Sequence, residues 1–65
     1  METNLYLSEK LLKATDVADI LNISRAMAYQ FMQQGKIRSV QIGTSRRVRF
    51  EDLSAFITEN LTPQQ

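Results

Sequence analysis

The stretch that decides the fold spans residues 14–35 and reads ATDVADILNISRAMAYQFMQQG. It contains two segments of helical pattern, residues 15–21 and 25–34, separated by three residues that begin with Asn22 and end with Ser24. Asn tolerates the left-handed backbone conformation that is needed just past the end of a helix. Ser is a good N-cap, because its side-chain oxygen can accept a hydrogen bond from the free amides that open the next helix. The sequence therefore predicts two helices joined by a sharp turn.

The second predicted helix carries two stripes of different chemistry. Ser24 and Gly35 bracket this helix, and the residues at core spacing are Ala28, Phe31, Met32 and Gly35. The residues on the other side are Ala26, Tyr29, Gln30 and Gln33. Gln can bond bidentately to adenine in the major groove of DNA, Ala can touch a thymine methyl group, and Arg25 in the first turn can reach guanine or a phosphate. This pattern is typical of a helix-turn-helix; a plain solvated face is the alternative, because Gln is a good helix former that needs no function.

The first predicted helix has an apolar stripe about two turns long. Its members, at spacings of three and four, are Ala14, Val17, Ala18, Ile20 and Leu21. Asp16 falls in the first turn, where the helix dipole favours an anion. Either Lys13 or Thr15 can occupy the N-cap position, and of the two only Thr is a good cap.

The composition argues against an enzyme. A chain of 65 residues forms one small domain, and this one has no Cys and no His, so disulfides, thiolate zinc sites and the commonest general base are missing. We expect no metal, cofactor or small-molecule ligand. Glu51, Asp52 and Tyr29 are the tempting catalytic groups, and a solvated helix start explains the two acids better. Because no signal peptide or membrane-length apolar run is recognisable, a cytoplasmic protein is expected.

The charges divide sharply along the chain. The segment 20–50 contains no acid, and its six cations are Arg25, Lys36, Arg38, Arg46, Arg47 and Arg49. The flanking segments are net negative, and the whole chain has a net charge of +1. Clustered cations release counterions from phosphates, so this asymmetry predicts a face for a polyanion. A solvated basic surface without a partner is the alternative.

A hairpin with one apolar face is predicted for residues 37–50. Val40 and Ile42 alternate with polar residues, and after the turn Gly43-Thr44-Ser45 the alternation resumes with Val48 and Phe50 on one side and arginines on the other. A lone hairpin is marginal in water, so we expect this apolar face to pack against the helices. The residues of the hairpin and its flank that are predicted to contact a phosphate backbone or a minor groove are Lys36, Arg38, Thr44, Ser45, Arg46, Arg47 and Arg49. Charges that deter edge-strand aggregation explain one or two of these.

A third helix is predicted over residues 52–61. Its core positions by spacing are Leu53, Phe56, Ile57, Asn60 and Leu61. Glu51 and Asp52 lie at its positive end, Thr62-Pro63 closes it, and Phe56 and Phe31 are the largest core candidates. Leu5-Tyr6-Leu7 either forms a short strand or lies across the core, and we expect residues 1–10 and 62–65 to be flexible ends.

Several short motifs, in order and at matching distances, resemble the excisionase-type DNA-binding domains, small relatives of the MerR winged-helix group found in phage and mobile-element proteins. The matching pieces within residues 11–57 are residues 17–24, Tyr29, Phe31-Met32, residues 35–37, Ile42-Gly43, Arg47-Val48, residues 51–53 and residues 55–57. The chain departs from the family pattern at Asn22, where Gly is usual, at Lys13, where a Thr-like cap is usual, and at Thr44, which is often basic. The resemblance implies a mainly α winged helix-turn-helix fold with three short helices and a two-stranded antiparallel hairpin, the second helix entering the major groove and the wing contacting the adjacent minor groove or backbone.

Three functions are consistent with these residues. The resemblance favours an excisionase, an accessory protein that binds and bends double-stranded DNA, joined by further copies of itself and an integrase. A small transcriptional regulator of a phage or mobile element shares the same contacts. A protein-interaction module with a basic face is a third hypothesis, and it predicts little affinity for duplex DNA. In the first two cases the protein is expected at the nucleoid. The second predicted helix would then be the recognition helix, and its predicted DNA contacts are Ser24, Arg25, Ala26, Tyr29, Gln30 and Gln33.

Overall fold

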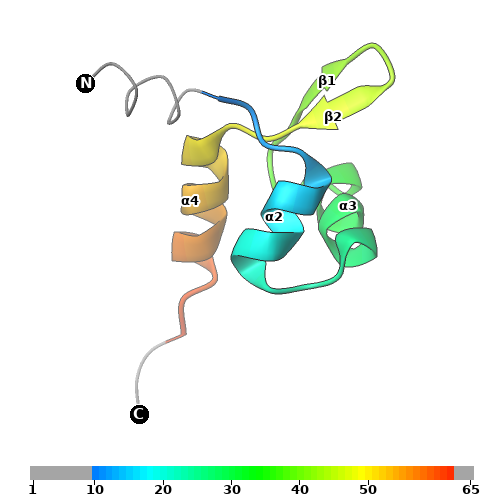
Figure 1. Cartoon of the computed structure of the whole chain (residues 1–65). Helices are drawn as coiled ribbons and strands as arrows, with labels where there is room; N and C mark the ends of the chain where they lie inside the picture. The colour runs from blue at the N-terminus through cyan, green and yellow to red at the C-terminus, as the bar shows by residue number, and fades with distance from the viewer. Residues whose placement is uncertain (1–9, 63–65) are drawn as a thin grey trace, which may run out of the picture.

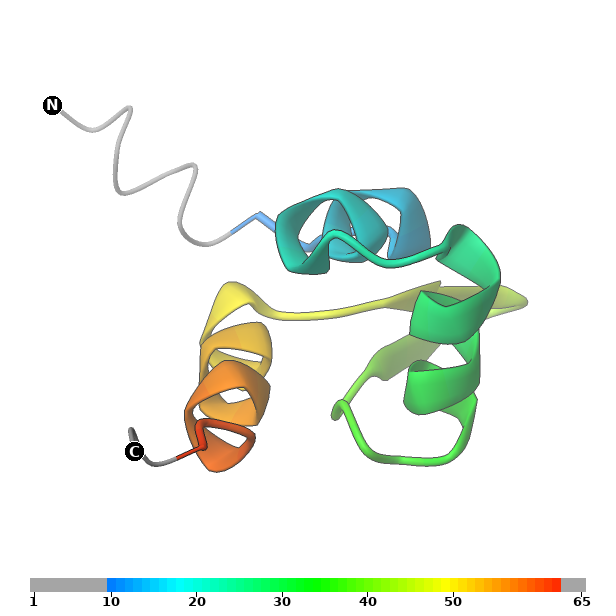
Figure 2. The ribbon, with the colours of Figure 1, turned by 90° about the horizontal axis from the view of Figure 1, so that it is seen from below.

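The computed structural model describes residues 10–62, which form three helices and one hairpin. In chain order the elements are α2 (Ala14–Leu21), α3 (Arg25–Gln33), β1 (Val40–Ile42), β2 (Ser45–Arg47) and α4 (Phe50–Glu59). Helix α4 lies on one side of the molecule, and α3 lies with the hairpin on the other (Figures 1 and 2). The predicted fold class, a winged helix-turn-helix, is confirmed. The expectations for Leu5-Tyr6-Leu7 and for ends at 1–9 and 63–65 lie outside the described residues.

The turn between α2 and α3 has the predicted chemistry. Asn22 adopts the left-handed conformation with φ 59° and ψ 46°. This lets the Ile23 N–H donate to the Ala18 carbonyl at 3.0 Å, which satisfies a carbonyl at the end of α2. The Ser24 hydroxyl then accepts from the Met27 N–H at 3.1 Å and caps α3. Two side chains of the right type thus set the sharp change of direction.

The start of α2 uses a different cap from the one that sequence favours. Lys13 occupies the N-cap position, and Thr15 lies inside the helix. The Asp16 carboxylate accepts from the Lys13 N–H at 2.9 Å, which is the reaching-back half of a capping box. An acid three residues into the helix therefore compensates for the poor capping ability of Lys.

The end of α3 fixes the link to the hairpin. The helix ends at Gln33, one residue earlier than predicted, and Gly35 has a φ of +78°, which favours Gly. The Lys36 and Ile37 N–H groups both donate to the Phe31 carbonyl, at 2.9 and 3.2 Å. Because Ile37 is also fully buried, the chain leaves α3 in a defined direction.

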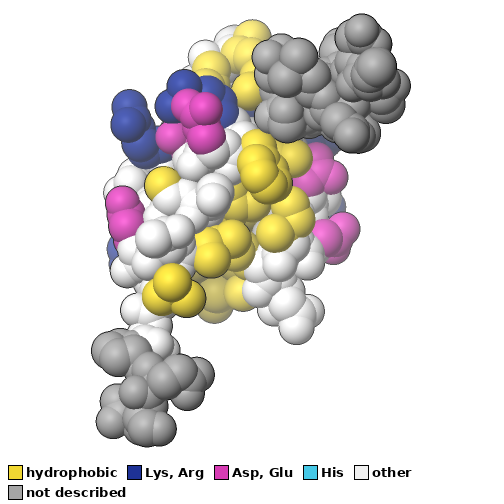
Figure 3. Space-filling model, turned by 90° about the vertical axis from the view of Figure 1, so that its left-hand side faces the viewer, with side chains coloured by type: hydrophobic (Ala, Val, Ile, Leu, Met, Phe, Trp, Pro, Cys, Tyr) yellow, Lys and Arg dark blue, Asp and Glu magenta, His cyan; other side chains and the backbone are white. Residues whose placement is uncertain are grey.

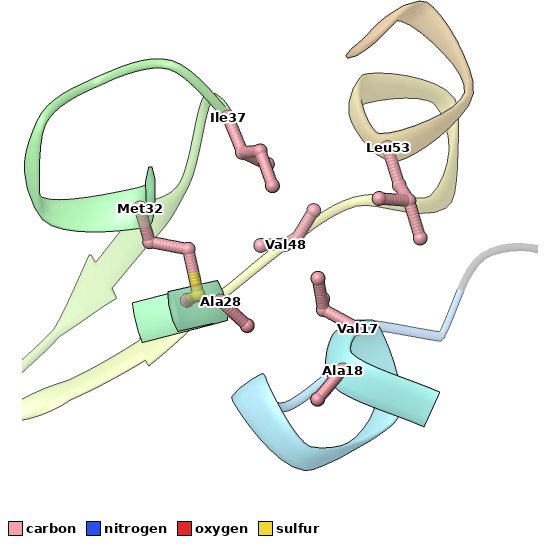
Figure 4. Packing of buried hydrophobic residues seen from close by; sticks show 7 residues of the cluster. All are labelled: Val17, Ala18, Ala28, Met32, Ile37, Val48 and Leu53. Atoms are coloured by element: carbon pink, nitrogen blue, oxygen red, sulfur yellow. The ribbon is translucent and has the colours of Figure 1, made fainter. Parts of the chain in front are cut away.

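The core is small and draws on every helix. Its buried members are Val17, Ala18, Ala28, Met32, Ile37, Val48 and Leu53, shown in Figure 4. The largest of these side chains are fully buried, and half-buried residues such as Leu12 and Phe31 surround them. Phe31 and Phe56 pack against each other at the margin, with ring centroids 5.6 Å apart and planes tilted by 42°. The two aromatic rings therefore close the edge of the core rather than form its centre.

The hairpin register differs from the prediction. The connection has two residues, Gly43 and Thr44, and the antiparallel pairs are Val40↔Arg47, Gln41↔Arg46 and Ile42↔Ser45. A three-residue turn would place Val40 opposite Val48 and create the expected apolar face. A shift of one residue exchanges the faces of a strand, so Val40 and Ile42 lie with Arg47, and both are exposed. The expectation that this face packs against the helices is wrong.

The inward end of the hairpin is held by a pairing that the sequence did not indicate. Val48 follows β2 and forms an isolated antiparallel bridge with Leu12. The Leu12 N–H donates to the Val48 carbonyl at 2.8 Å, and the Val48 N–H donates to the Leu12 carbonyl at 2.9 Å. The segment just before α2 thus acts as a third, one-residue strand and attaches the wing to the body of the domain.

Helix α4 begins earlier and buries less than predicted. Phe50 is its first residue rather than the end of a strand, and Asn60 caps it before the expected Thr62-Pro63 stop. Of its predicted core positions, Leu53 is buried and Phe56 is half-buried, whereas Ile57 and Leu61 are exposed. Figure 3 shows hydrophobic side chains gathered on the α4 side of the molecule. Ile20 of α2, also predicted in an apolar stripe, is 49 % exposed. A domain of this size has too few elements to cover such wide stripes.

Two leucines of the α4 segment provide a test of this core. Leu53 is 1 % exposed and Leu61 is 70 % exposed. We expect Leu53→Ala to lower the free energy of unfolding by about 2–5 kcal/mol, through lost burial and a residual cavity. Leu61→Ala should stay within about 0.5 kcal/mol of the wild type. Urea unfolding followed by circular dichroism measures both, and equal losses for the two variants would contradict the described core.

Candidate nucleic-acid interface

Helix α3 presents the polar stripe to solvent. Its buried residues, Ala28 and Met32, lie on the core side, which leaves the predicted contact residues on the outside. The residues that the structure places there, all exposed, are Ser24, Arg25, Ala26, Tyr29, Gln30 and Gln33. Within this set, the Ser24 hydroxyl already accepts the cap bond from Met27, so it has one remaining lone pair and its proton for a ligand.

A shallow hollow lies at the beginning of this stripe. It has a volume of about 410 Å³ and is lined by Ala14, Arg25, Ala26 and Tyr29. Ala14 opens α2 and Arg25 opens α3, so the positive ends of two helices face one open depression. Small side chains at Ala14 and Ala26 let a ligand approach the backbone, and Arg25 and Tyr29 supply the polar groups.

The two arginines of β2 keep most of their hydrogen-bonding capacity. Arg46 and Arg47 are half-buried, and Thr44 is exposed in the turn before them. Arg47 Nη1 donates to the Arg46 carbonyl at 2.9 Å, and Arg46 Nη1 lies 3.5 Å from the Ser39 hydroxyl. A guanidinium group has five N–H donors, so these contacts orient each side chain and leave several donors for another partner. Ser45 is half-buried beside them.

Lys36 and Arg38 occupy the link between α3 and the hairpin. Both are exposed. The Lys36 ammonium group lies 5.9 Å from the centroid of the Phe31 ring, at the outer limit of a cation–π contact. Arg38 lies close enough to Asp52 for its charge to contribute to the lowered pKa of that carboxyl group. The two cations therefore continue the basic surface from the end of α3 towards the wing.

Arg49 is bound by two carboxylates of α4. Its Nε and Nη2 atoms donate to the two Asp52 carboxylate oxygens at 2.6 and 3.0 Å, and its Nη1 lies 2.9 Å from Glu51. The hydrogen bond from Arg49 is the main cause that lowers the pKa of Asp52 below its usual value, and the same bond raises the pKa of Arg49. This bidentate pair joins the N-cap residue of α4 to its first turn. Two acids compensate the charge of Arg49, whereas Arg46 and Arg47 form no ion pair with the described residues.

The acidic residues lie outside α3 and the hairpin strands. In the described range they belong to α2 and α4, at Asp16, Asp19, Glu51, Asp52 and Glu59, whereas α3, β1 and β2 carry none. Helix α4, with Glu51, Asp52 and Glu59, lies on the side opposite α3 and the hairpin (Figure 2), whereas Asp16 and Asp19 belong to α2, which packs against α3. Within residues 10–62 there is no group of His, Cys, Asp and Glu side chains that could hold a metal ion, and no helix is long and apolar enough to cross a membrane.

This geometry defines the class of protein. Two helices joined by a capped three-residue turn and followed by a basic hairpin form a winged helix-turn-helix domain. The model of the helix-turn-helix domain family matches residues 11–61, which is most of the chain, and the chain belongs to that family. This membership supports binding to double-stranded DNA and is consistent with the excisionase-type resemblance. No curated protein and no solved structure matches the chain.

The Arg49–Asp52 pair has a signature in the sequence. The pair Arg49 and Asp52 stands at i and i+3 across a helix start, a spacing at which side chains meet. The bridge from Leu12 to Val48 left no such signal, because a single-residue strand has no periodicity.

The Arg49–Asp52 pair leads to a pH-dependent stability. Because the pKa of Asp52 is lower in the folded chain, its stabilising effect is fully present above the ordinary Asp pKa of about 3.9 and is lost as the pH falls through the lowered value. We expect Asp52→Asn to unfold more easily than the wild type at neutral pH and to lose less stability on acidification. Urea unfolding midpoints across the acid range measure this, with exposed Glu59→Gln as control. Parallel curves for wild type and Asp52→Asn would contradict the role of the pair.

Proposed function

We propose that this protein binds duplex DNA sequence-specifically, with α3 in the major groove and the hairpin on the adjacent backbone or minor groove. The observation that carries this proposal is the exposed, uncharged polar stripe of α3 beside a hairpin rich in arginine and free of acids. A solvated helix face normally mixes charges of both signs, whereas this stripe offers amides, a phenol and a small methyl group. Those are the groups that distinguish base edges.

In this proposal α3 supplies the sequence readout. Gln30 and Gln33 are one turn apart and exposed, so each amide can present a donor and an acceptor to a base edge. Ala26 is small enough to contact a thymine methyl group, and Tyr29 extends beyond it with 41 % of its surface exposed. Arg25 lies at the start of the helix, where it can reach a guanine or a phosphate.

The hairpin and its flank supply most of the electrostatic affinity. Arg46 and Arg47 keep free guanidinium donors, and Lys36 and Arg38 extend the same surface. Contacts of this kind fix the position of a protein on the duplex and make its affinity depend on salt. We assign Arg49 to the stability of α4 rather than to DNA, because its guanidinium group is already bound by two carboxylates.

The proposed biological role is that of an excisionase, an accessory factor that shapes DNA for an integrase without catalysing a reaction. The excisionase-type resemblance supports this role, and so does the small base-reading surface of one domain, which favours several copies side by side or a recombinase partner on DNA. The protein would then act in the cytoplasm, on the nucleoid. Genomic footprinting tests the role: binding beside an integrase attachment site supports it, whereas binding confined to promoters identifies a transcriptional regulator instead.

Two substitutions separate the proposed roles of the wing and α3. Arg47→Ala should weaken binding to all duplexes alike and reduce the slope of log affinity against log salt by about one phosphate contact. Gln30→Ala should cost about 1–3 kcal/mol mainly on the specific site and leave the slope unchanged. Fluorescence anisotropy titrations at several salt concentrations, on specific and scrambled duplexes, measure both quantities.

The control for these variants is Thr58→Ala, an exposed polar residue of α4 on the far side of the molecule. It should bind like the wild type. A silent Arg47→Ala would exclude the wing from the interface, and equal effects of Gln30→Ala on specific and scrambled DNA would exclude α3 as the reader. If the wild type binds no duplex at low salt, a protein partner for the basic face becomes the better explanation.

A further inference from the structure

The hairpin exposes two aliphatic side chains that neither the core nor the charge pattern explains. Val40 is 36 % exposed and Ile42 is 55 % exposed, and both point to the side of the sheet away from Val48. Strand β1 is an edge strand, and exposed edges usually carry charged residues that prevent association. Here the edge reads Val-Gln-Ile, without a charge. An uncharged aliphatic edge beside the wing tip is therefore available for an apolar contact with a ligand.

The register of the hairpin places these aliphatic residues among polar groups. Residues that face each other across antiparallel strands have their side chains on one face, so Val40 lies beside Arg47 and Ile42 beside Ser45. We call this set the wing face: Val40, Ile42, Ser45 and Arg47. Ile42 directly precedes the Gly43-Thr44 turn and is therefore the aliphatic residue nearest the tip.

We propose that the wing face enters the minor groove, where Ile42 packs as an apolar wedge against the sugars and a base step while Arg47 binds the neighbouring phosphate. This inference rests on the proposed DNA-binding function and names the residues that deform the duplex. Minor-groove proteins insert aliphatic side chains such as Ile between base steps, and the partial unstacking bends the duplex towards the major groove. The wing face combines such a side chain with a cation one pair further from the turn on the same face, where Arg47 lies opposite Val40.

Charge and size favour DNA over a protein as the occupant of the wing face. The segment 20–50 has six cations and no acid, so a second copy of the same surface would be repelled. A stable protein interface buries about 800 Å² on each partner, and two aliphatic side chains on a three-residue strand offer much less. A narrow, negatively charged groove lined by deoxyribose carbons matches both the size of the wing face and its charge.

The test compares two substitutions on the same strand. Ile42→Thr keeps a β-branched side chain and removes the apolar end, whereas Gln41→Thr places the same side chain on the opposite face of β1 and gives up the 3.4 Å bond from Gln41 Nε2 to the Gly43 carbonyl. On a duplex labelled at both ends with a donor and an acceptor dye, Ile42→Thr should bind about tenfold more weakly, by the loss of about half of a buried aliphatic side chain, and should bend the DNA less. Its salt slope should equal that of the wild type, because no phosphate contact is lost. Ile42→Val should recover most of the bending.

The outcomes distinguish this inference from the proposed function. If Ile42→Thr and Gln41→Thr both bind the duplex as tightly as the wild type and bend it equally, the wedge is overturned and the DNA-binding function stays intact. The same conclusion follows if Ile42→Thr alters self-association without DNA, measured by sedimentation equilibrium, because the face would then be a protein interface. A wild type that binds no duplex overturns the proposed function itself. Val40→Thr provides a second variant, and unchanged urea midpoints show that each variant folds.

Discussion

The placement of the wing depends on one buried residue, Val48. Its side chain is fully buried in the core, and its backbone N–H and carbonyl both bond to Leu12 at 2.9 and 2.8 Å. Once Val48 points inward, the alternation of a strand directs Arg47 outward and Arg46 towards the same side as Val48. Because the turn has two residues, Val40 pairs with Arg47 and Ile42 with Ser45, so both aliphatic side chains lie on the exposed face with Arg47. The orientation of the basic hairpin is thus a consequence of core packing.

The structure also divides the charges between two tasks. Acids occur on α2 and α4, where Asp16 completes a capping interaction and Asp52 binds Arg49. These carboxylates stabilise helix starts, at the positive ends of the helix dipoles. Arg49 is withdrawn from the basic surface by this arrangement, whereas Arg46 and Arg47 are oriented by weak contacts that leave donors free. A chain of modest net charge can in this way present a strongly basic face.

The sequence predicted the features that rest on local chemistry and missed those that rest on tertiary contacts. The left-handed Asn22, the Ser24 cap and the Gly35 helix end were predicted and confirmed, because each is fixed by one residue type and its neighbours. The hairpin register was wrong, because alternation does not state the number of turn residues and one residue exchanges the faces. The polar stripe of α3 was found exposed as predicted, but its contact with DNA stays a prediction. The Arg49–Asp52 pair has the i, i+3 spacing at which helical side chains meet but was not predicted, and the Leu12–Val48 bridge emerged only from the fold.

In the proposed complex, specificity depends on how α3 and the wing are connected as much as on their side chains. The link between them is short, Ile37 is buried, and the Lys36 and Ile37 amides bond to the end of α3. A connection fixed at several points cannot adapt its angle to every duplex, so the DNA must supply part of the fit. Sequences that bend or narrow their minor groove at low cost are then preferred, even at base pairs that no side chain touches. Because Arg25 is the single cation of α3, affinity in the proposed complex would arise mainly at the wing, and the fixed link between α3 and the wing would favour DNA that deforms to meet both.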